Sequence, residues 1–214
     1  MSITVRPTSH SRKFNTNRKV LQAALALYGR EGWSGFNLTK VAKEAGVGKS
    51  SIYSRWPNRD VMFMDAVITL IPFLSVKGET LRDILHAEIE YRIKLYLGPY
   101  CESIRQIFVE GKTVDEPTLH QVHDRIFSIP ISNLKDKLWT YKASHQLPDS
   151  VSVTRLVDAI EGSVLMRTLL LPPENVPCFL TEIYEYADSL IADQLLRAQI
   201  PDSLQPNHLS CYCL

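Results

Sequence analysis

Apolar residues recur at intervals of three and four along almost the whole chain, and this spacing most constrains the fold. It is the period of one face of an α-helix, and no segment shows a convincing two-residue alternation of a strand. Gly, Pro and Asn residues interrupt the pattern often enough to predict separate helices. We therefore expect an all-α fold with helices at residues 18–30, 38–45, 49–56, 59–72, 80–97, 100–111, 118–141 (perturbed at Pro130), 153–171 and 177–198.

The charged residues divide the chain into two parts. Residues 1–60 hold 11 Lys and Arg against 3 Asp and Glu, a net charge of +8. The remaining residues hold 13 against 20, a net charge of −7. A basic head on an acidic body favours a head that binds an anion such as nucleic acid. We predict a DNA-binding domain with a basic arm over residues 1–60, a larger helical domain over 61–200 and an irregular tail over 201–214.

The sequence offers no signal for membrane insertion or export. It has no run of eighteen apolar residues, and its basic N-terminus lacks an apolar core, so we expect a cytoplasmic protein without membrane contact. Four cysteines, Cys101, Cys178, Cys211 and Cys213, have the spacing of neither a zinc site nor a disulfide framework. The last four residues fit the form of a prenylation box, but no polybasic segment adjoins them, and a frayed tail is the preferred interpretation.

Two short predicted helices, 38–45 and 49–56, are joined by Gly46-Val47-Gly48. Two helices joined by such a glycine-containing turn form a helix-turn-helix, whose second helix enters the major groove of DNA. Asn37 is expected to cap the first helix, and Gly32 to end the preceding helix in a left-handed conformation. The residues predicted to face inward are Leu38, Val41, Ala42, Ala45, Val47, Ile52 and Trp56. Those left outside are Thr39, Lys40, Lys49, Ser50, Ser51, Tyr53, Ser54 and Arg55, short donors and cations that suit phosphates and base edges.

On these residues, the segment from Arg18 to Ala66 resembles the DNA-binding domain of the tetracycline-repressor (TetR) family. The similar stretches are Val20–Ala24, Tyr28–Trp33, Val41–Val47 and Ile52–Arg59. The resemblance implies a three-helix head whose DNA contacts are Thr39, Lys49, Ser50, Ser51, Tyr53, Arg55 and Arg59, with the Tyr53 hydroxyl on a phosphate and Arg59 clamping the backbone. This chain departs from the family pattern at Gly48, Arg55, Trp56 and Arg59, and we expect Arg55 to shift the operator preference.

Plainer interpretations of the same residues remain open at this point. Tyr53 could be a core aromatic at the edge of an amphipathic helix, and Ser50 and Ser51 could serve only as helix caps. The basic residues Arg6, Arg12 and Lys13 fit a minor-groove arm, although a disordered basic tail is slightly preferred.

Two other constellations compete with DNA binding. Residues 46–50 resemble the end of a phosphate-binding loop, but Lys43 stands where that motif requires glycine, and a helix precedes it instead of a strand. His120 and His123 could ligate a metal, but further ligands are not evident, and surface histidines are the preferred interpretation. An enzyme built on the helical body is a second class of function, yet spacing identifies no nucleophile–base pair or carboxylate dyad. We expect no catalytic site, cofactor or metal.

The body is predicted to dimerise and to bind an effector. The last two long helices carry apolar arcs wider than a surface helix needs, and the resemblance assigns such helices to a homodimer interface. The resemblance also implies an effector pocket, whose candidates are Tyr91, Arg105, Phe108, His123, Phe127, Trp139 and Met166. The expected function is a repressor of transcription that a small, mainly apolar effector releases from double-stranded operator DNA. The alternative is a ligand-binding or enzymatic helical bundle whose basic head binds nucleic acid without sequence specificity.

Overall fold

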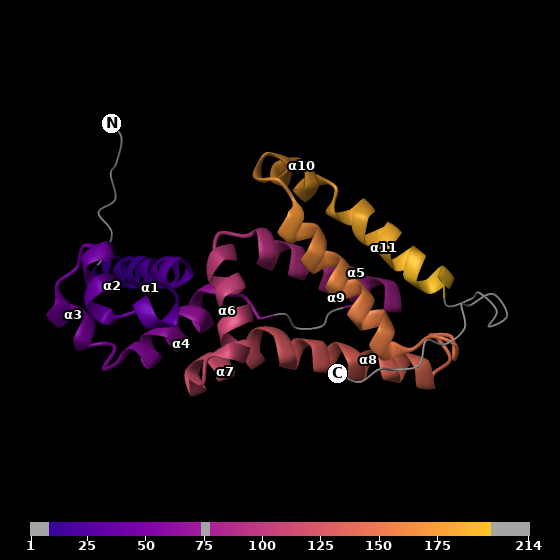
Figure 1. Ribbon diagram of the computed structural model, residues 1–214, viewed down its shortest axis with the longest axis horizontal. Coiled ribbons are helices and arrows are strands. Elements are labelled where there is room, and N and C mark those ends of the chain that lie inside the picture. The colour runs from indigo at the N-terminus through magenta and orange to yellow at the C-terminus, as the bar shows by residue number, and fades with distance from the viewer. Residues whose placement is uncertain (1–8, 74–77, 198–214) are drawn as a thin grey trace. The chain divides into compact units, whose positions relative to one another are not determined.

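The structure, a computed structural model, describes residues 9–73 and 78–197, with side chains from 16 to 195 apart from the gap. Every regular element in these ranges is a helix, which confirms the predicted all-α fold (Figure 1). The chain forms two compact units: unit 1 holds residues 1–75 and 93–132, and unit 2 holds residues 76–92 and 133–214. This grouping differs from the division at residue 60 suggested by the charges, which stays a prediction.

The N-terminal part of unit 1 contains four helices. They are α1 (Ser9–Gly35), α2 (Leu38–Ala45), α3 (Lys49–Tyr53) and α4 (Arg59–Leu70). Their core contains four packed aromatic rings. The rings of Tyr28, Trp33, Phe36 and Phe63 lie at centroid distances of 4.4–6.4 Å from one another. Such ring pairs stabilise a core beyond the burial of their surface. We call these four helices the reading head.

Unit 1 also contains α6 (Cys101–Thr113), α7 (Pro117–His123) and a π-turn (Asp124–Ser128). The helices α6 and α1 touch closely, since a Cβ atom on Gly29 would lie 2.9 Å from the backbone nitrogen of Ser103. The buried Ser103 hydroxyl donates a 2.8 Å hydrogen bond to the carbonyl of Leu25. The reading head and α6 therefore share a tightly packed seam.

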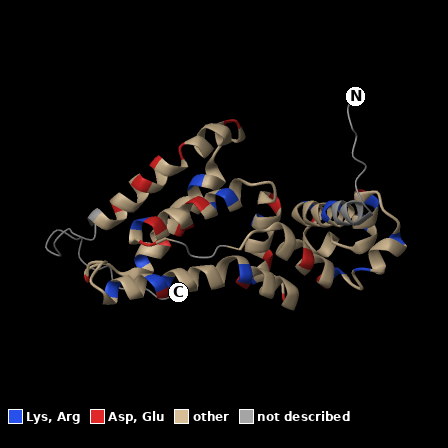
Figure 2. Cartoon of the chain, turned by 180° about the vertical axis from the view of Figure 1, so that it is seen from behind, with Lys and Arg blue, Asp and Glu red and all other residues tan. Residues whose placement is uncertain are grey.

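Unit 2 is built from the first part of α5 (Leu81–Leu97), most of α8 (Ile129–Ala143), α9 (Val153–Leu170), a 3-10 turn (Pro173–Asn175), α10 (Val176–Thr181) and α11 (Ile183–Arg197). Its interior contains an ionic cluster: Arg92 Nε donates to Glu88 Oε1 at 2.7 Å and lies 3.1 Å from Glu161 Oε2. Arg92 and Glu88 are fully buried. The charged side chains described on α11 are acidic: Glu185, Asp188 and Asp193 (Figure 2).

Two helix predictions differ from the structure, and a third, the perturbation at Pro130, occurs as expected. The first helix begins at Ser9, well before residue 18, and it incorporates part of the predicted basic tail. A π-turn precedes Pro130, which lacks an amide hydrogen and disturbs the helix as expected. The predicted helix 177–198 is interrupted at Glu182, next to Thr181, whose hydroxyl donates to the Cys178 carbonyl at 2.7 Å. Such a bond from a threonine side chain competes with helix continuation.

Candidate nucleic-acid interface

Two caps define the helix-turn-helix. The Asn37 side chain accepts a 2.9 Å hydrogen bond from the Lys40 amide and so begins α2. Gly46 ends α2 with φ 67° and ψ 37°, a left-handed conformation that glycine adopts without steric cost. Both caps confirm the sequence prediction, and Gly32 also has a positive φ, of 64°.

The predicted inward face is largely correct. Leu38, Val41, Ala42, Ala45, Ile52 and Trp56 are buried, while Val47 is partly exposed. The Trp56 indole nitrogen donates a 2.7 Å hydrogen bond to Asp65 Oδ2, so its one polar atom has a partner. The turn between α2 and α3 therefore rests on a dry core and has a defined geometry.

The predicted DNA-contacting side chains are all exposed or partly exposed, and we call them the recognition surface. It comprises Thr39, Lys49, Ser50, Ser51, Tyr53, Arg55 and Arg59. Tyr53 is 51% exposed, so it is not the core aromatic of the alternative interpretation. Gly48, rather than a serine side chain, stands at the N-cap of α3, and its extended backbone forms no side-chain cap. Ser50 and Ser51 are thus inside the helix, where neither acts as its N-cap.

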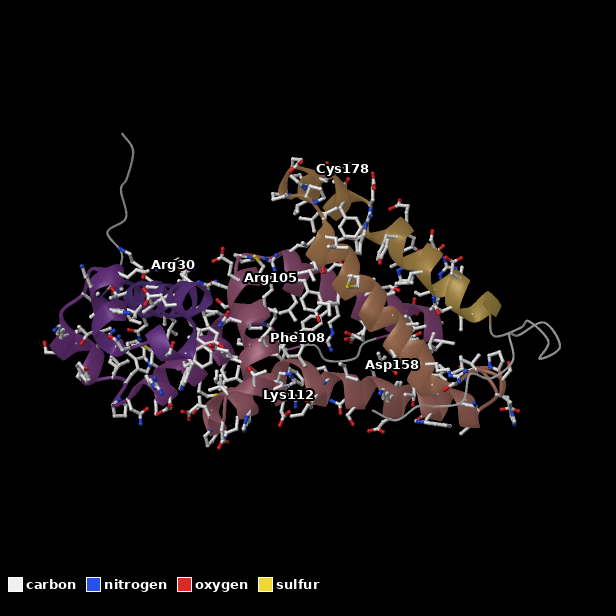
Figure 3. All side chains as sticks on the ribbon, in the orientation of Figure 1. Arg30, Arg105, Phe108, Lys112, Asp158 and Cys178 are labelled. Carbon is white, nitrogen blue, oxygen red and sulfur yellow. The ribbon has the colours of Figure 1, made fainter. Side chains whose placement is uncertain are left out.

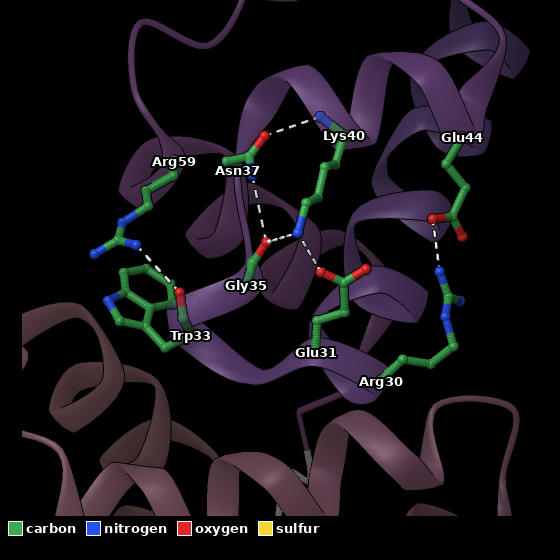
Figure 4. Close-up of polar contacts among 8 residues, drawn as sticks. All are labelled: Arg30, Glu31, Trp33, Gly35, Asn37, Lys40, Glu44 and Arg59. Carbon is green, nitrogen blue, oxygen red and sulfur yellow. Dashed lines mark hydrogen bonds and ion pairs between the residues drawn. The ribbon is translucent and has the colours of Figure 1, made fainter.

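The two arginines of the recognition surface already have protein partners. Arg55 Nη1 donates to Asn17 Oδ1, which connects the turn after α3 with the N-terminal part of α1. Arg59 Nη1 donates to the Trp33 carbonyl at 3.1 Å (Figure 4), and its Nη2 lies 3.7 Å from Glu116 Oε2. A phosphate contact by Arg59 therefore competes with Glu116.

Acidic side chains of α6 and of the residue before α7 form hydrogen bonds with the reading head. Glu110 accepts from the Trp33 amide at 3.0 and 3.2 Å, and Glu116 accepts from the Trp33 indole at 3.1 Å. Exposed ion pairs join Lys40 to Glu31 and Arg30 to Glu44 (Figure 4). The roles of Asn17, Glu110 and Glu116 were not anticipated from the sequence, because Glu110 and Glu116 lie 77 and 83 positions from Trp33, and no local pattern signals such contacts.

Three of the predicted effector residues lie together in unit 1. The ring of Phe127 lies 5.3 Å from Phe108 and 5.1 Å from His123, and we call these three side chains the aromatic cluster. Phe108 projects from α6 (Figure 3) and is 41% exposed. Gly111 packs directly on His123, since a Cβ atom there would lie 2.5 Å from the His123 Cβ.

The interpretation of His123 as a surface residue is wrong. It is 6% exposed because α7 turns it onto Gly111 and the neighbouring rings. Burial, supported by the nearby Lys112, lowers the pKa of His123 and keeps the imidazole neutral at pH 7. Its Nδ1 is buried and lies 3.7 Å from Asp124 Oδ1, beyond hydrogen-bond distance. Among residues 9–73 and 78–197, no group of three or more His, Cys, Asp or Glu side chains is placed to hold a metal ion.

The other effector candidates are dispersed. Arg105 is exposed on α6, and Trp139, 53% exposed, lies on α8. Tyr91 is partly exposed on α5. Met166 lines a separate hollow of about 650 Å³ in unit 2, between α9, α10 and α11. Within the described ranges no helix combines the length and apolar character needed to cross a bilayer.

The comparisons with known proteins agree with this geometry. Residues 20–66, the span of the helix-turn-helix and its neighbours, match the model for bacterial regulatory proteins of the tetR family. An uncharacterized HTH-type transcriptional regulator, YdeS of Bacillus subtilis (strain 168), is 24% identical over 159 residues, which cover 72% of this chain and 79% of the relative.

Solved structures share the fold over most of the chain. A SmeT–triclosan complex superposes with a TM-score of 0.62 at 14% identity, covering 92% of this chain and all of that one. FadR of Bacillus subtilis in complex with stearoyl-CoA gives 0.50 at 16% identity, covering 83% and 96%. The protein is a DNA-binding transcriptional regulator of the helix-turn-helix class. Its residues 20–66 are similar to the DNA-binding domain of the tetR family of bacterial regulatory proteins.

Proposed function

We propose that the protein is a cytoplasmic, dimeric repressor that a small, mainly apolar effector releases from its operator. The observation that carries this proposal is the recognition surface, which presents hydroxyls and cations from α2, α3 and the start of α4 over a fixed apolar core. Helix-turn-helix proteins place such side chains in the major groove, where they contact phosphates and base edges.

The DNA contacts are proposed residue by residue. The exposed hydroxyl of Tyr53 and the ammonium group of Lys49 bind phosphates, and Ser50 and Ser51 lie near base edges or the backbone. Thr39 at the start of α2 adds a phosphate contact. Arg55 contacts a base or a phosphate once its hydrogen bond to Asn17 is broken. Arg59 clamps the backbone when it leaves Glu116.

Selection of operators from random duplexes with the full-length protein tests sequence-specific recognition. We expect a palindromic sequence to be enriched, and its affinity to fall steeply between two salt concentrations because bound phosphates release counterions. Binding without any enriched sequence would support non-specific nucleic-acid binding instead and would refute the repressor.

The effector is proposed to bind at the aromatic cluster. The rings of Phe108 and Phe127 are apolar, and the buried Nδ1 of His123 offers a polar atom for orientation, which is the usual composition of small-molecule sites. SmeT binds triclosan and FadR binds stearoyl-CoA within similar folds, which supports a mainly apolar ligand here.

Unit 1 contains a physical connection between the aromatic cluster and the reading head. Gly111 touches His123, and the preceding residue, Glu110, accepts hydrogen bonds from the Trp33 amide. A ligand that displaces His123 therefore acts on α6, which forms the seam with α1. Two recognition helices must stay about 34 Å apart to fit successive major grooves, so a small shift of the reading head weakens binding.

A thermal-shift screen of hydrophobic metabolites and drugs, followed by operator-binding assays on the hits, tests the effector. Phe108→Ala should lower the stabilisation by a hit, whereas Val109→Ala, an exposed neighbour on α6, should not. Hits that stabilise the protein without changing operator affinity would refute the coupling.

The dimer is proposed to form through α9 and α11. Large apolar side chains are exposed there, among them Leu169 at 54% and Tyr184 at 64%. Gly162 on α9 is also open, since a Cβ atom there meets nothing within 4 Å. Ile183, apolar and within the proposed region, is only 9% exposed and belongs to the core of unit 2. It is therefore unsuitable for testing the interface.

A further inference from the structure

The hollow in unit 2 has one apolar wall and one cationic edge. Its volume is about 650 Å³, within the usual range of small-molecule sites. Met166, Leu170 and Leu171 of α9 and Phe179 of α10 provide the apolar wall. Both Met166 and Leu170 are more than half exposed, so the wall faces solvent in the isolated chain.

Arg167 provides the positive charge. Its guanidinium carbon lies 5.3 Å from the centroid of the Phe179 ring, so the aromatic face holds the cation at the hollow. Within the part of the chain that the structure describes, no carboxylate forms an ion pair with Arg167. The planar fork of its N–H groups fits a carboxylate.

The other polar groups of the hollow are neutral. Burial raises the pKa of Tyr186, although Arg167 acts in the opposite direction, so the hydroxyl keeps its proton at pH 7 and can donate it in a hydrogen bond. Cys178, labelled in Figure 3, donates its thiol to Glu182 Oε1 at 3.3 Å. The Glu182 carboxylate raises the pKa of this thiol, so the thiol stays protonated, and Glu182 is the negative charge beside this edge of the hollow.

We propose that this hollow binds an amphipathic carboxylate, an apolar molecule whose single anionic group pairs with Arg167. The apolar body would lie on Met166, Leu170 and Phe179, and the Tyr186 hydroxyl would donate to the carboxylate. This site goes beyond the proposed repressor function, because it depends neither on DNA binding nor on the aromatic cluster of unit 1.

Calorimetry on the full-length protein with three matched probes tests the site. Decanoate, decanol and decylammonium share one apolar chain and differ in charge. We expect decanoate to bind, decanol to bind about tenfold more weakly and decylammonium not to bind, because only the carboxylate gains a charge-assisted hydrogen bond.

Substitutions on α9 separate charge from folding. Arg167→Gln should lower decanoate affinity about tenfold and leave decanol unchanged. Arg167→Glu should favour decylammonium over decanoate. Arg155→Gln removes another exposed arginine of α9 away from the hollow, and it should change nothing.

Three results would overturn the proposal. They are equal affinity for the three probes, decanoate binding that survives Arg167→Gln, and loss of binding in Arg155→Gln of the same size as in Arg167→Gln. A second copy of the chain is the competing occupant. If no probe binds and Leu170→Asp converts a dimer to a monomer in light scattering, the hollow is part of the dimer interface.

Discussion

Arg59 lies over the indole of Trp33, with its guanidinium carbon 4.3 Å from the ring centroid, and also donates to the Trp33 carbonyl. Glu116 accepts from the same indole nitrogen and lies 3.7 Å from Arg59. Arg59, which is proposed to bind the DNA backbone, is therefore bound by Trp33 and Glu116 where the reading head meets α7. Competition between Glu116 and phosphate for Arg59 can be measured.

Replacing Glu116 with Gln should raise operator affinity by up to about fivefold, because a partly exposed ion pair contributes about 0.2–1 kcal/mol. Glutamine can still accept from the Trp33 indole, so the fold should be retained. Fluorescence anisotropy with a labelled operator measures the change. Asp115→Asn removes the same charge from an exposed neighbouring position, and an equal gain there would attribute the effect to net charge alone.

Tyr53→Phe and Lys49→Ala should each weaken operator binding by about 1 kcal/mol, the usual contribution of one hydrogen bond or exposed ionic contact. Both residues are exposed, so the melting temperature should not change. Lys137→Ala on α8 provides a matched control with no expected effect on DNA. Unchanged affinity in Tyr53→Phe would remove the proposed phosphate contact.

The ionic cluster of unit 2 predicts a pH dependence of stability. Burial, with the neighbouring Glu88 opposing the pull of Arg92, raises the pKa of Glu161 from 4.5 to about 7. The folded state therefore binds a proton that the unfolded state releases between these values, and this contribution to stability is present below about pH 4.5 and lost as pH rises to about 7.

Glu161→Gln fixes the neutral form. Its free energy of unfolding should match that of the wild type near pH 4 and exceed it at pH 8 by up to about 3 kcal/mol. Urea titrations at both pH values measure the difference, with Glu185→Gln, exposed on α11, as the control. A variant that is less stable than the wild type at pH 8 would show that Arg92 requires the charged carboxylate.

Gly162→Arg should convert the proposed dimer to a monomer at micromolar concentration. The position is open in the isolated chain, so arginine fits there, but a dry interface would have to bury its charge. Light scattering measures the mass, and Ala143→Arg, exposed at the end of α8, should remain dimeric. A wild-type monomer would refute the interface, as would a dimeric Gly162→Arg protein.

The sequence was informative wherever the structure follows from neighbouring residues. Asn37 and Gly46 could be assigned as caps because capping depends on a few adjacent residues, and the apolar spacing of α2 and α3 identified their buried faces. Exposure of Tyr53 was left open, because periodicity does not decide the edge of an amphipathic helix.

Long-range contacts were not predictable. Glu110 and Glu116 reach Trp33 only after α6 and α7 pack on the reading head, and His123 is buried by the same packing. Of seven effector candidates, only Phe108, His123 and Phe127 form one cluster, because aromatic residues in a helical body serve the core and the surface as well as a ligand site. The break at Glu182 lies beside a side-chain hydrogen bond of Thr181, which apolar spacing does not reveal.

The seam between α1 and α6 limits how this regulator can be recombined. Gly29 and Ser103 are in close contact across it, although they belong to two segments separated by residues 76–92, which hold most of α5. A hybrid that exchanges only residues 1–75 would set Gly29 and Trp33 against a foreign α6. We expect the DNA specificity of this chain to be transferred to a hybrid only when residues 93–132 are exchanged together with residues 1–75. The two segments are not contiguous, so the exchangeable cassette is discontinuous in the gene.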